Sequence, residues 1–222
     1  MIELEDVRFQ YRRGGFGLHV GHLAIEAGRL VAFVGPSGSG KTTLVSLISG
    51  ILAPASGALR VGGVDLASQP DARRRRFRIA RIGMVFQDFE LLEYLTVRDN
   101  VLLPYRINRA LRLEASVRER AGRLAEAVGL GDKLDRYPGS LSHGERQRLA
   151  ICRAMIAEPA ILIADEPTGN LDAKTARRIL ELMFDQARRS GATFLMVTHD
   201  GSLLDGFDRV VDVTELSGRP RA

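Results

Sequence analysis

Hydrophobic and polar residues alternate at the start of the chain. Ile2, Leu4, Val7 and Phe9 are separated by polar or charged residues, and residues 18–25 continue the alternation up to Gly28. A period of two places one face of a strand against a core and leaves the other face in solvent. The pattern therefore predicts an antiparallel sheet at the N-terminus.

Later strands are predicted from short, nearly continuous apolar runs at residues 30–34, 82–86, 161–164 and 193–197. A helix is expected between the last two runs, from about residue 173 to 189. Asp172 is its expected N-cap, and Gly191 follows its end. Apolar strands that alternate with helices are typical of a parallel sheet covered by helices.

The stretch from Leu91 to about Glu158 has helical periodicity. Apolar residues such as Val117, Ala121 and Leu124 recur every three or four positions before Gly129. We expect a helical insertion between the core strands.

The composition fits one sizeable core with an inserted subdomain, because the chain has 222 residues and is 45% hydrophobic. No stretch approaches the roughly 20 apolar residues of a membrane span. The first six residues are acidic, unlike a secretory signal, so we expect the chain to stay in the cytosol. Cys152 is the only cysteine, which excludes an intrachain disulfide and a cysteine cluster for zinc.

The formal net charge of +5 permits contact with nucleic acid, an anionic membrane surface or a nucleotide, and selects none of them. The densest basic run is Arg73 to Arg76 with Arg78 and Arg81. It is more typical of a solvated helix face than of a specific anion site.

Candidate chemistry is concentrated in a glycine-rich stretch after the apolar run at 30–34. Gly35-Pro36-Ser37-Gly38-Ser39-Gly40-Lys41-Thr42 fits the phosphate-binding loop G-x-x-x-x-G-K-[ST]. In such a loop, backbone N–H groups surround phosphates, the lysine reaches the terminal phosphates and the Ser/Thr hydroxyl binds Mg²⁺. The N-terminus of the following helix adds a partial positive charge.

Polar residues follow three of the predicted strands. They are Gln87, the pair Asp165 and Glu166, and His199. In an open parallel sheet, ligands bind at the carboxyl ends of the strands, where the phosphate loop also lies. Asp165 fits the carboxylate that holds Mg²⁺ in phosphate-loop NTPases, Glu166 fits a base for the attacking water, and His199 fits a contact to the γ-phosphate. Tyr11 follows the first strand as an aromatic on which a base can stack, although an aromatic at a strand end more often serves packing.

A second motif carries a family resemblance that covers nearly the whole chain. Leu141-Ser142-His143-Gly144-Glu145 resembles the signature L-S-G-G-Q of ATP-binding cassette (ABC) ATPases, and Asp165-Glu166-Pro167 follows at the family's spacing. The resemblance implies an α/β fold with a P-loop NTPase (RecA-like) parallel core, an N-terminal antiparallel β subdomain and an inserted α-helical subdomain. One ABC ATPase domain is expected over residues 1–222. Within it, residues 1–87 and 159–222 form the β subdomain and ATP-binding core, and residues 88–158 form the helical subdomain with the signature.

The resemblance also implies site residues, with ATP and Mg²⁺ as cofactors. Glu166, His199 and Gln87 are the expected catalytic group, and Thr42, Gln87 and Asp165 are the expected Mg²⁺ group. The expected nucleotide-binding residues are Tyr11, Gly35, Pro36, Ser37, Gly38, Ser39, Gly40, Lys41, Thr42, Thr43, Ser142, Gly144 and Asp172. Asp172 belongs to Gly169-Asn170-Leu171-Asp172, which resembles the loop that crosses between protomers.

In this family, the signature residues Ser142 and Gly144 contact ATP bound to the opposite protomer. Two chains are therefore expected to close head to tail around two ATP molecules. His143 departs from the consensus glycine and Glu145 from the consensus glutamine; Glu145 resembles many exporter ATPases. Because Gly144 is retained, a working site is expected.

Residues 83–104 are similar to the subgroup that serves lipoprotein release and macrolide-type efflux, which often has proline where Glu93 stands. The chain also stops soon after the strand at 210–213, without a regulatory domain. We therefore expect a motor for an integral-membrane permease with an export or extrusion role. Its expected location is peripheral, on the cytoplasmic face of the inner or plasma membrane.

Two alternatives stay open. One is a regulatory or mechanotransmission ATPase of the cell-division type, which acts on a membrane partner without moving a substrate. The other is a soluble ABC ATPase that acts on nucleic acid or the ribosome. Such proteins usually carry a long coiled coil or two cassettes, and 222 residues hold one cassette, so no nucleic-acid partner is expected.

Overall fold

The computed structural model describes residues 1–11, 15–108, 111–169 and 171–216. The chain divides into two compact units, one of residues 1–78 with 193–222 and one of residues 79–192. Each unit has its own strand pairing and its own buried side chains. The subdomain boundaries expected from the sequence, 1–87 with 159–222 and 88–158, stay a prediction.

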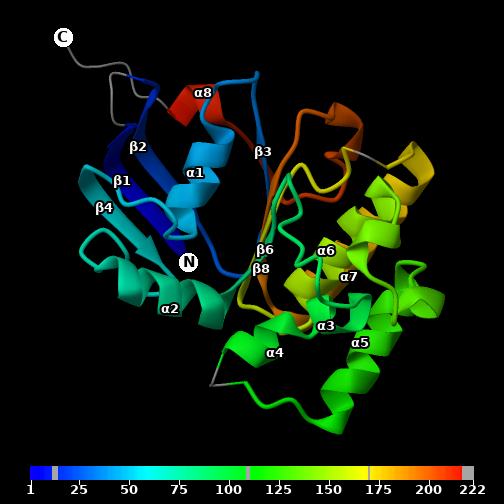
Figure 1. Ribbon diagram of the computed structural model, residues 1–222. Helices are drawn as coiled ribbons and strands as arrows, with labels where there is room; N and C mark the ends of the chain where they lie inside the picture. The colour runs from blue at the N-terminus through cyan, green and yellow to red at the C-terminus, as the bar shows by residue number, and fades with distance from the viewer. Residues whose placement is uncertain (12–14, 109–110, 170, 217–222) are drawn as a thin grey trace. The chain divides into compact units, whose positions relative to one another are not determined.

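An antiparallel sheet opens the first unit, as the alternating N-terminal pattern predicts. Its strand order is β2 (Gly17–Ile25), β1 (Ile2–Gln10), β4 (Ser56–Val61) and β5 (Val64–Asp65). The strands β1, β2 and β4 lie side by side in blue and cyan (Figure 1). Leu4 faces Leu23 on β2 and Leu59 on β4, and all three side chains are buried. Burial of such a side chain contributes about 1.5–3 kcal/mol, which fixes the register of the sheet.

Parallel strands complete the first unit. β3 (Leu30–Val34) pairs in parallel with β8 (Thr193–Val197) on one side and with β9 (Arg209–Asp212) on the other. Phe33 and Phe194 are fully buried. The helices α1 (Lys41–Ile48) and α8 (Val213–Leu216) follow β3 and β9, and the short η3 (Gly201–Leu203) follows β8.

The second unit combines a parallel strand pair with a group of helices. β6 (Ile82–Val85) pairs in parallel with β7 (Ile161–Asp165). The helices α3, α5 and α6 gather together in this unit (Figure 1). Its helices are α3 (Val97–Val101), α4 (Leu103–Ile107), α5 (Ala115–Ala127), η1 (Gly131–Lys133), η2 (Pro138–Ser140), α6 (His143–Met155) and α7 (Ala173–Ser190). The predicted parallel pairing and the predicted helical stretch are therefore both present.

The limits of α7 match their sequence signals. The Asp172 side chain accepts a hydrogen bond from the N–H of Thr175 at 3.0 Å and caps the helix. Gly191 ends the helix with φ at 67°, in the left-handed region that favours glycine. Within the described ranges, no helix is both long enough and apolar enough to cross a membrane.

The arginine-rich run forms α2 (Asp71–Arg81), which carries the chain from the first unit to the second. None of its residues is buried, which agrees with the prediction of a solvated helix face. The side chain of Arg74 is 13% exposed and donates hydrogen bonds to the carbonyls of Gly50 and Gln69. Its role is therefore to tie α2 to the turns before it.

The packing of α6 on β6 depends on a glycine. A β-carbon at Gly83 would lie 2.1 Å from the carbonyl oxygen of Ala154 and 2.8 Å from Cγ of Pro159. Because one contact is to backbone, relief would require the helix to move away from the strand.

We predict that Gly83→Ala lowers the free energy of unfolding by about 1–3 kcal/mol, the usual cost of overpacking. Urea denaturation measures the change. The control is Gly122→Ala, inside α5 with no atom near the added carbon, which should raise the stability by about 0.5–1 kcal/mol. Equal stability of Gly83→Ala and the wild type would contradict the packing described.

Candidate functional site

The phosphate loop lies between β3 and α1 in the first unit. Gly35, Gly38 and Gly40 have φ angles of 143°, 80° and 97°, which side chains disfavour. A β-carbon at Gly40 would also lie 2.8 Å from the Phe16 ring. The loop therefore has a curled backbone that only glycine permits at these positions, and it ends at the first turn of a helix.

Lys41 folds back over this loop. Its ammonium donates hydrogen bonds to the carbonyl oxygens of Gly35 at 2.8 Å and Pro36 at 2.9 Å, and the residue is 8% exposed. These bonds hold a positive charge at the centre of the loop. An anionic group that enters the loop meets this charge together with the N-terminus of α1.

A buried hydroxyl in the loop also favours a bound phosphate group. The hydroxyl oxygen of Ser39 is buried and has no hydrogen-bond partner among the described residues. Thr42, the first-turn hydroxyl expected at Mg²⁺, is exposed, whereas Thr43 is buried. A phosphate would supply the acceptor that the Ser39 hydroxyl lacks, since a buried hydroxyl without a partner is costly.

Tyr11 lies directly after β1 and is 43% exposed. Its hydroxyl is 3.4 Å from the hydroxyl of Thr43, and its ring meets Phe9 edge to face at 4.8 Å between centroids. A pocket of about 510 Å³ is lined by Phe9, Gln10, Tyr11, Ala53 and Ala55. The first unit thus brings the predicted aromatic residue to the phosphate-loop helix.

His199 follows β8 in the same unit and is exposed, with Thr198 buried before it. The neighbouring Asp200 accepts a hydrogen bond from the N–H of Ser202 at 2.9 Å and caps η3. The predicted position of His199 at a strand end is therefore correct, while its contact to phosphate stays a prediction.

The acidic pair lies at the end of β7 in the second unit. Asp165 is the last residue of the strand and is 8% exposed. Glu166 is half-buried and has a φ of 49°, a left-handed conformation that is uncommon for a residue with a side chain. The strand therefore ends in an abrupt change of backbone direction at Glu166, directly after Asp165.

The signature residues begin α6 in this unit. The Ser142 hydroxyl accepts a hydrogen bond from the N–H of Glu145 at 3.3 Å, and the Glu145 carboxylate accepts one from the N–H of Ser142 at 2.9 Å. This reciprocal pair is a capping box, for which glutamate and glutamine both serve. Lys133 also pairs with Glu145. The substitution of Glu145 for the consensus glutamine is thus explained by local structure.

His143, the other departure from the consensus, contacts the segment that follows Gln87. Its ring lies 4.7 Å from the ring of Phe89, centroid to centroid, at 65°. Phe89 is 7% exposed, whereas Gln87 and His143 are exposed. Arg153, further along α6, donates hydrogen bonds to the carbonyl oxygens of Phe89 and Glu90. The second unit thus holds the segment after Gln87 against α6.

The predicted site residues fall into two groups, one in each unit. The first unit holds Tyr11, residues 35–43 and His199. The second unit holds Gln87, Ser142, Gly144, Asp165, Glu166 and Asp172. Asn170, in the expected loop between protomers, lies outside the described residues. The roles assigned to these residues stay predictions.

Sequence reasoning missed Asp212, which ends β9 beside the phosphate loop. A β-carbon at Gly35 would lie 3.4 Å from its carboxylate. The hydroxyl and N–H of Thr214 donate to Asp212 at 2.7 and 2.8 Å. These bonds, and more weakly the charge of Lys41, lower the pKa of Asp212 below its ordinary value. The sequence did not single it out, because the strand expected at 210–213 placed Asp212 inside the strand, whereas β9 ends at this residue.

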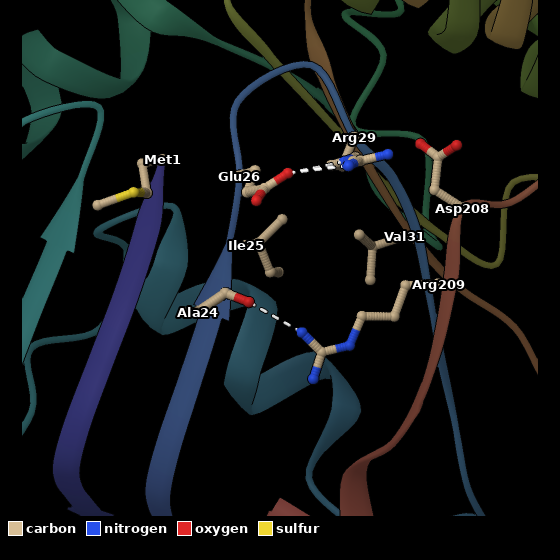
Figure 2. Close-up of a pocket in the computed structure, with 8 residues that line it drawn as sticks. All are labelled: Met1, Ala24, Ile25, Glu26, Arg29, Val31, Asp208 and Arg209. Atoms are coloured by element: carbon tan, nitrogen blue, oxygen red, sulfur yellow. Dashed lines mark hydrogen bonds and ion pairs between the residues drawn. The ribbon is translucent and has the colours of Figure 1, made fainter.

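A separate pocket of about 400 Å³ lies at the other end of the parallel strands (Figure 2). It is lined by Met1, Ala24, Ile25, Glu26, Arg29, Val31, Asp208 and Arg209, none of which was predicted as a site residue. Its polar groups serve the fold: Arg29 donates to Glu26 at 3.0 Å, and Arg209 donates to the carbonyl of Ala24 at 2.9 Å. The pocket is therefore not part of the nucleotide site.

Comparison with known proteins gives consistent results. The family model described as ABC transporter matches residues 18–169. The lipoprotein-releasing system ATP-binding protein LolD of Anaeromyxobacter dehalogenans is 42% identical over 217 residues, which cover 96% of this chain and 90% of that protein. The macrolide export ATP-binding/permease protein MacB of Rhodopirellula baltica is 44% identical over 214 residues. That match covers 95% of this chain and 31% of MacB, so the chain spans about a third of the length of that relative.

Solved structures agree with the fold. A dimeric structure of the bacterial ABC transporter cassette MJ0796 matches with a TM-score of 0.87 at 31% identity, over 96% of this chain and 95% of that one. A dimeric post-hydrolysis state of MJ0796 bound to ADP and Pi matches with the same TM-score at 30% identity. The α/β fold with a phosphate-loop core, expected from the sequence, is confirmed.

We predict that Glu145, in the capping box of α6, makes a pH-dependent contribution to the free energy of unfolding. The hydrogen bond from Lys133, and then those from Ser142, lower the pKa of Glu145 below its ordinary value of 4.5. A lowered pKa means that the carboxylate stabilises the folded state above about pH 4.5, and that this contribution is lost as the pH falls below it. Glu145→Gln retains the cap and loses the ion pair, which for such a pair is worth about 0.5–1 kcal/mol.

Urea denaturation of both proteins between neutral and acidic pH measures this difference. The wild type should be more stable than Glu145→Gln at pH 7, and the difference should shrink as the pH falls below about 4.5. A difference that does not change with pH would show that the ion pair is not its source.

Proposed function

The chain belongs to the ABC transporter family and is one of its ATP-hydrolysing cassettes, and from this membership we propose that it closes head to tail with a second copy around two MgATP. In that arrangement each ATP lies between the phosphate loop of one copy and the signature helix of the other. Nucleotide binding is supported by the glycine-built loop with Lys41 held against it, and the second copy by the similarity to the dimeric structures of the cassette MJ0796.

ATP binding would use the groups that the first unit brings together. The loop N–H groups and Lys41 bind the phosphates, and the exposed ring of Tyr11 stacks on adenine. His199 contacts the γ-phosphate. Lys41 would exchange its bonds to Gly35 and Pro36 for bonds to phosphate oxygens, so its charge need not move far.

Mg²⁺ would be held by the Thr42 hydroxyl, Asp165 and Gln87, together with phosphate oxygens and water. Hydroxyl, carboxylate and amide oxygens are the hard ligands that this ion prefers, and the few protein ligands suit its need to retain water. When bound, the ion neutralises charge that develops on the phosphates.

Glu166 is the proposed general base. Its carboxylate accepts a proton from water as the water oxygen forms a bond to the γ-phosphorus and the bond to the bridging oxygen of ADP breaks. Ser142 and Gly144, at the N-terminus of the 13-residue α6 of the second copy, would contact the γ-phosphate and stabilise its charge.

Hydrolysis would release the pair of cassettes, because the bridging phosphate is lost. This two-state change fits a motor for an integral-membrane permease at the cytoplasmic face of the inner or plasma membrane. The names of the relatives LolD and MacB support a lipoprotein-release or export role over import. The second candidate is a mechanotransmission ATPase that moves no substrate. Both candidates hydrolyse ATP, so hydrolysis alone does not distinguish them.

We predict that Glu166→Gln lowers the ATP turnover number at least about 100-fold, because general base catalysis contributes this much. The variant should accumulate as an ATP-bound dimer, measured by light scattering after gel filtration. The exposed Glu181 on α7 offers a matched control, since Glu181→Gln should behave as the wild type. Unchanged turnover in Glu166→Gln would overturn the base assignment, and a monomer in ATP would overturn the head-to-tail dimer.

The membrane role has its own test. The chain, co-expressed with candidate permeases, should co-purify with an exporter-type partner and hydrolyse ATP faster when that partner's substrate is added. Co-purification with hydrolysis that no substrate stimulates would favour the mechanotransmission role. Stable association with an importer permease that works with a binding protein would contradict the export assignment.

A further inference from the structure

The backbone of Glu166 is held by two hydrogen bonds to its carbonyl oxygen. One comes from the N–H of Gly169 at 3.3 Å and the other from the side-chain amide Nε2 of Gln147, also at 3.3 Å. Glu166 itself is in the left-handed region, with φ at 49°. A residue with a side chain keeps such a conformation only where its surroundings impose it.

Gln147 is well placed to impose this conformation. It lies on α6, one helical turn after His143, and is 1% exposed. Its Nε2 donates to the Glu166 carbonyl, whereas its Oε1 is buried without a hydrogen-bond partner among the described residues. The amide orientation is therefore fixed by the single bond to Glu166.

The lack of a partner for this oxygen within the described part of the chain indicates that Gln147 does not serve packing alone. A buried acceptor without a partner destabilises the folded state, and an apolar side chain of the same shape would avoid that cost. Departures from the most stable choice of side chain are expected at functional sites.

We propose that Gln147 is a positioning residue for the general base. Its amide holds the Glu166 carbonyl, which fixes the left-handed backbone and so the direction in which the carboxylate leaves the end of β7. Ser142 and Gly144 lie at the start of the same helix, so the signature contacts and the backbone of the base are linked through one rigid element. The inference rests on the proposed role of Glu166 and deepens it.

The variant that tests this role is Gln147→Met, which keeps the length and bulk of the side chain and removes the donor. We expect kcat for ATP to fall about 10- to 100-fold, since a small misplacement of a catalytic group costs up to this much. The KM for ATP should change by less than about threefold, because no proposed ATP contact is altered. Urea denaturation should show a variant as stable as the wild type or more stable.

The matched control is Gln186→Met on α7, the same substitution in the same unit at a half-buried position. It should leave kcat and KM unchanged.

A double-mutant cycle with Glu166→Gln separates positioning from an independent effect. If Gln147 acts through Glu166, the double variant should turn over ATP no more slowly than Glu166→Gln alone. If the losses multiply, Gln147 acts by another route and the proposal is wrong. Wild-type kcat in a folded Gln147→Met protein would overturn it as well.

Two further results are informative. If Gln147→Met does not fold, Gln147→Asn, which is one methylene too short to reach the carbonyl, takes its place with the same expectations for kcat and KM. If Glu166→Gln retains wild-type turnover, the base assignment fails, and the positioning role that depends on it fails as well. If Glu166→Gln loses turnover while Gln147→Met keeps the wild-type kcat, only the positioning role is rejected.

Discussion

A backbone that must curl at the end of a buried strand is the constraint on which the nucleotide site depends. β3 is buried along almost its whole length and stops where Gly35 takes a φ of 143°. The curl allows the ammonium of Lys41 to reach the carbonyls of Gly35 and Pro36, and it brings the first turn of α1 to the same place. Because β3 pairs with β8 and β9, the loop is anchored on both sides by hydrogen-bonded strands. A flexible loop with the same residues would not hold a positive charge in a fixed position.

A comparable constraint acts in the second unit, where α6 organises the other half of the chemistry. The helix is capped by Ser142 and Glu145, and it contacts Phe89 through His143 and Glu166 through Gln147. Phe89 and Glu166 both have left-handed backbones. One rigid element therefore stabilises two strained turns, and these turns follow the two parallel strands β6 and β7 of the unit. This arrangement gives the departures from the signature consensus a physical meaning, since Glu145 caps the helix and His143 packs on a neighbouring segment.

The sequence was sufficient for features that depend on local chemistry. The period of two along β1 and β2, the apolar runs of β3 and β8, the cap of α7 and the glycine pattern of the phosphate loop all follow from neighbouring residues. The contact of His143 with Phe89 and the bond from Gln147 to Glu166 join residues 54 and 19 positions apart. No periodicity specifies such contacts, because they depend on how α6 rotates about its axis. Asp212 was missed for a different reason, since the expected strand at 210–213 ran one residue beyond the end of β9 and so hid a polar residue at a strand end.

The most direct test of the account is the dependence of ATP hydrolysis on the concentration of the purified wild-type chain with Mg²⁺. If two cassettes must meet around the nucleotide, the activity per chain should rise as the protein concentration rises and level off when the dimer dominates. It should also be lost when Mg²⁺ is removed by a chelator. An activity per chain that is the same at all concentrations would contradict a site shared between two chains. The absence of hydrolysis at every concentration would contradict the claim that the chain hydrolyses ATP without a membrane partner.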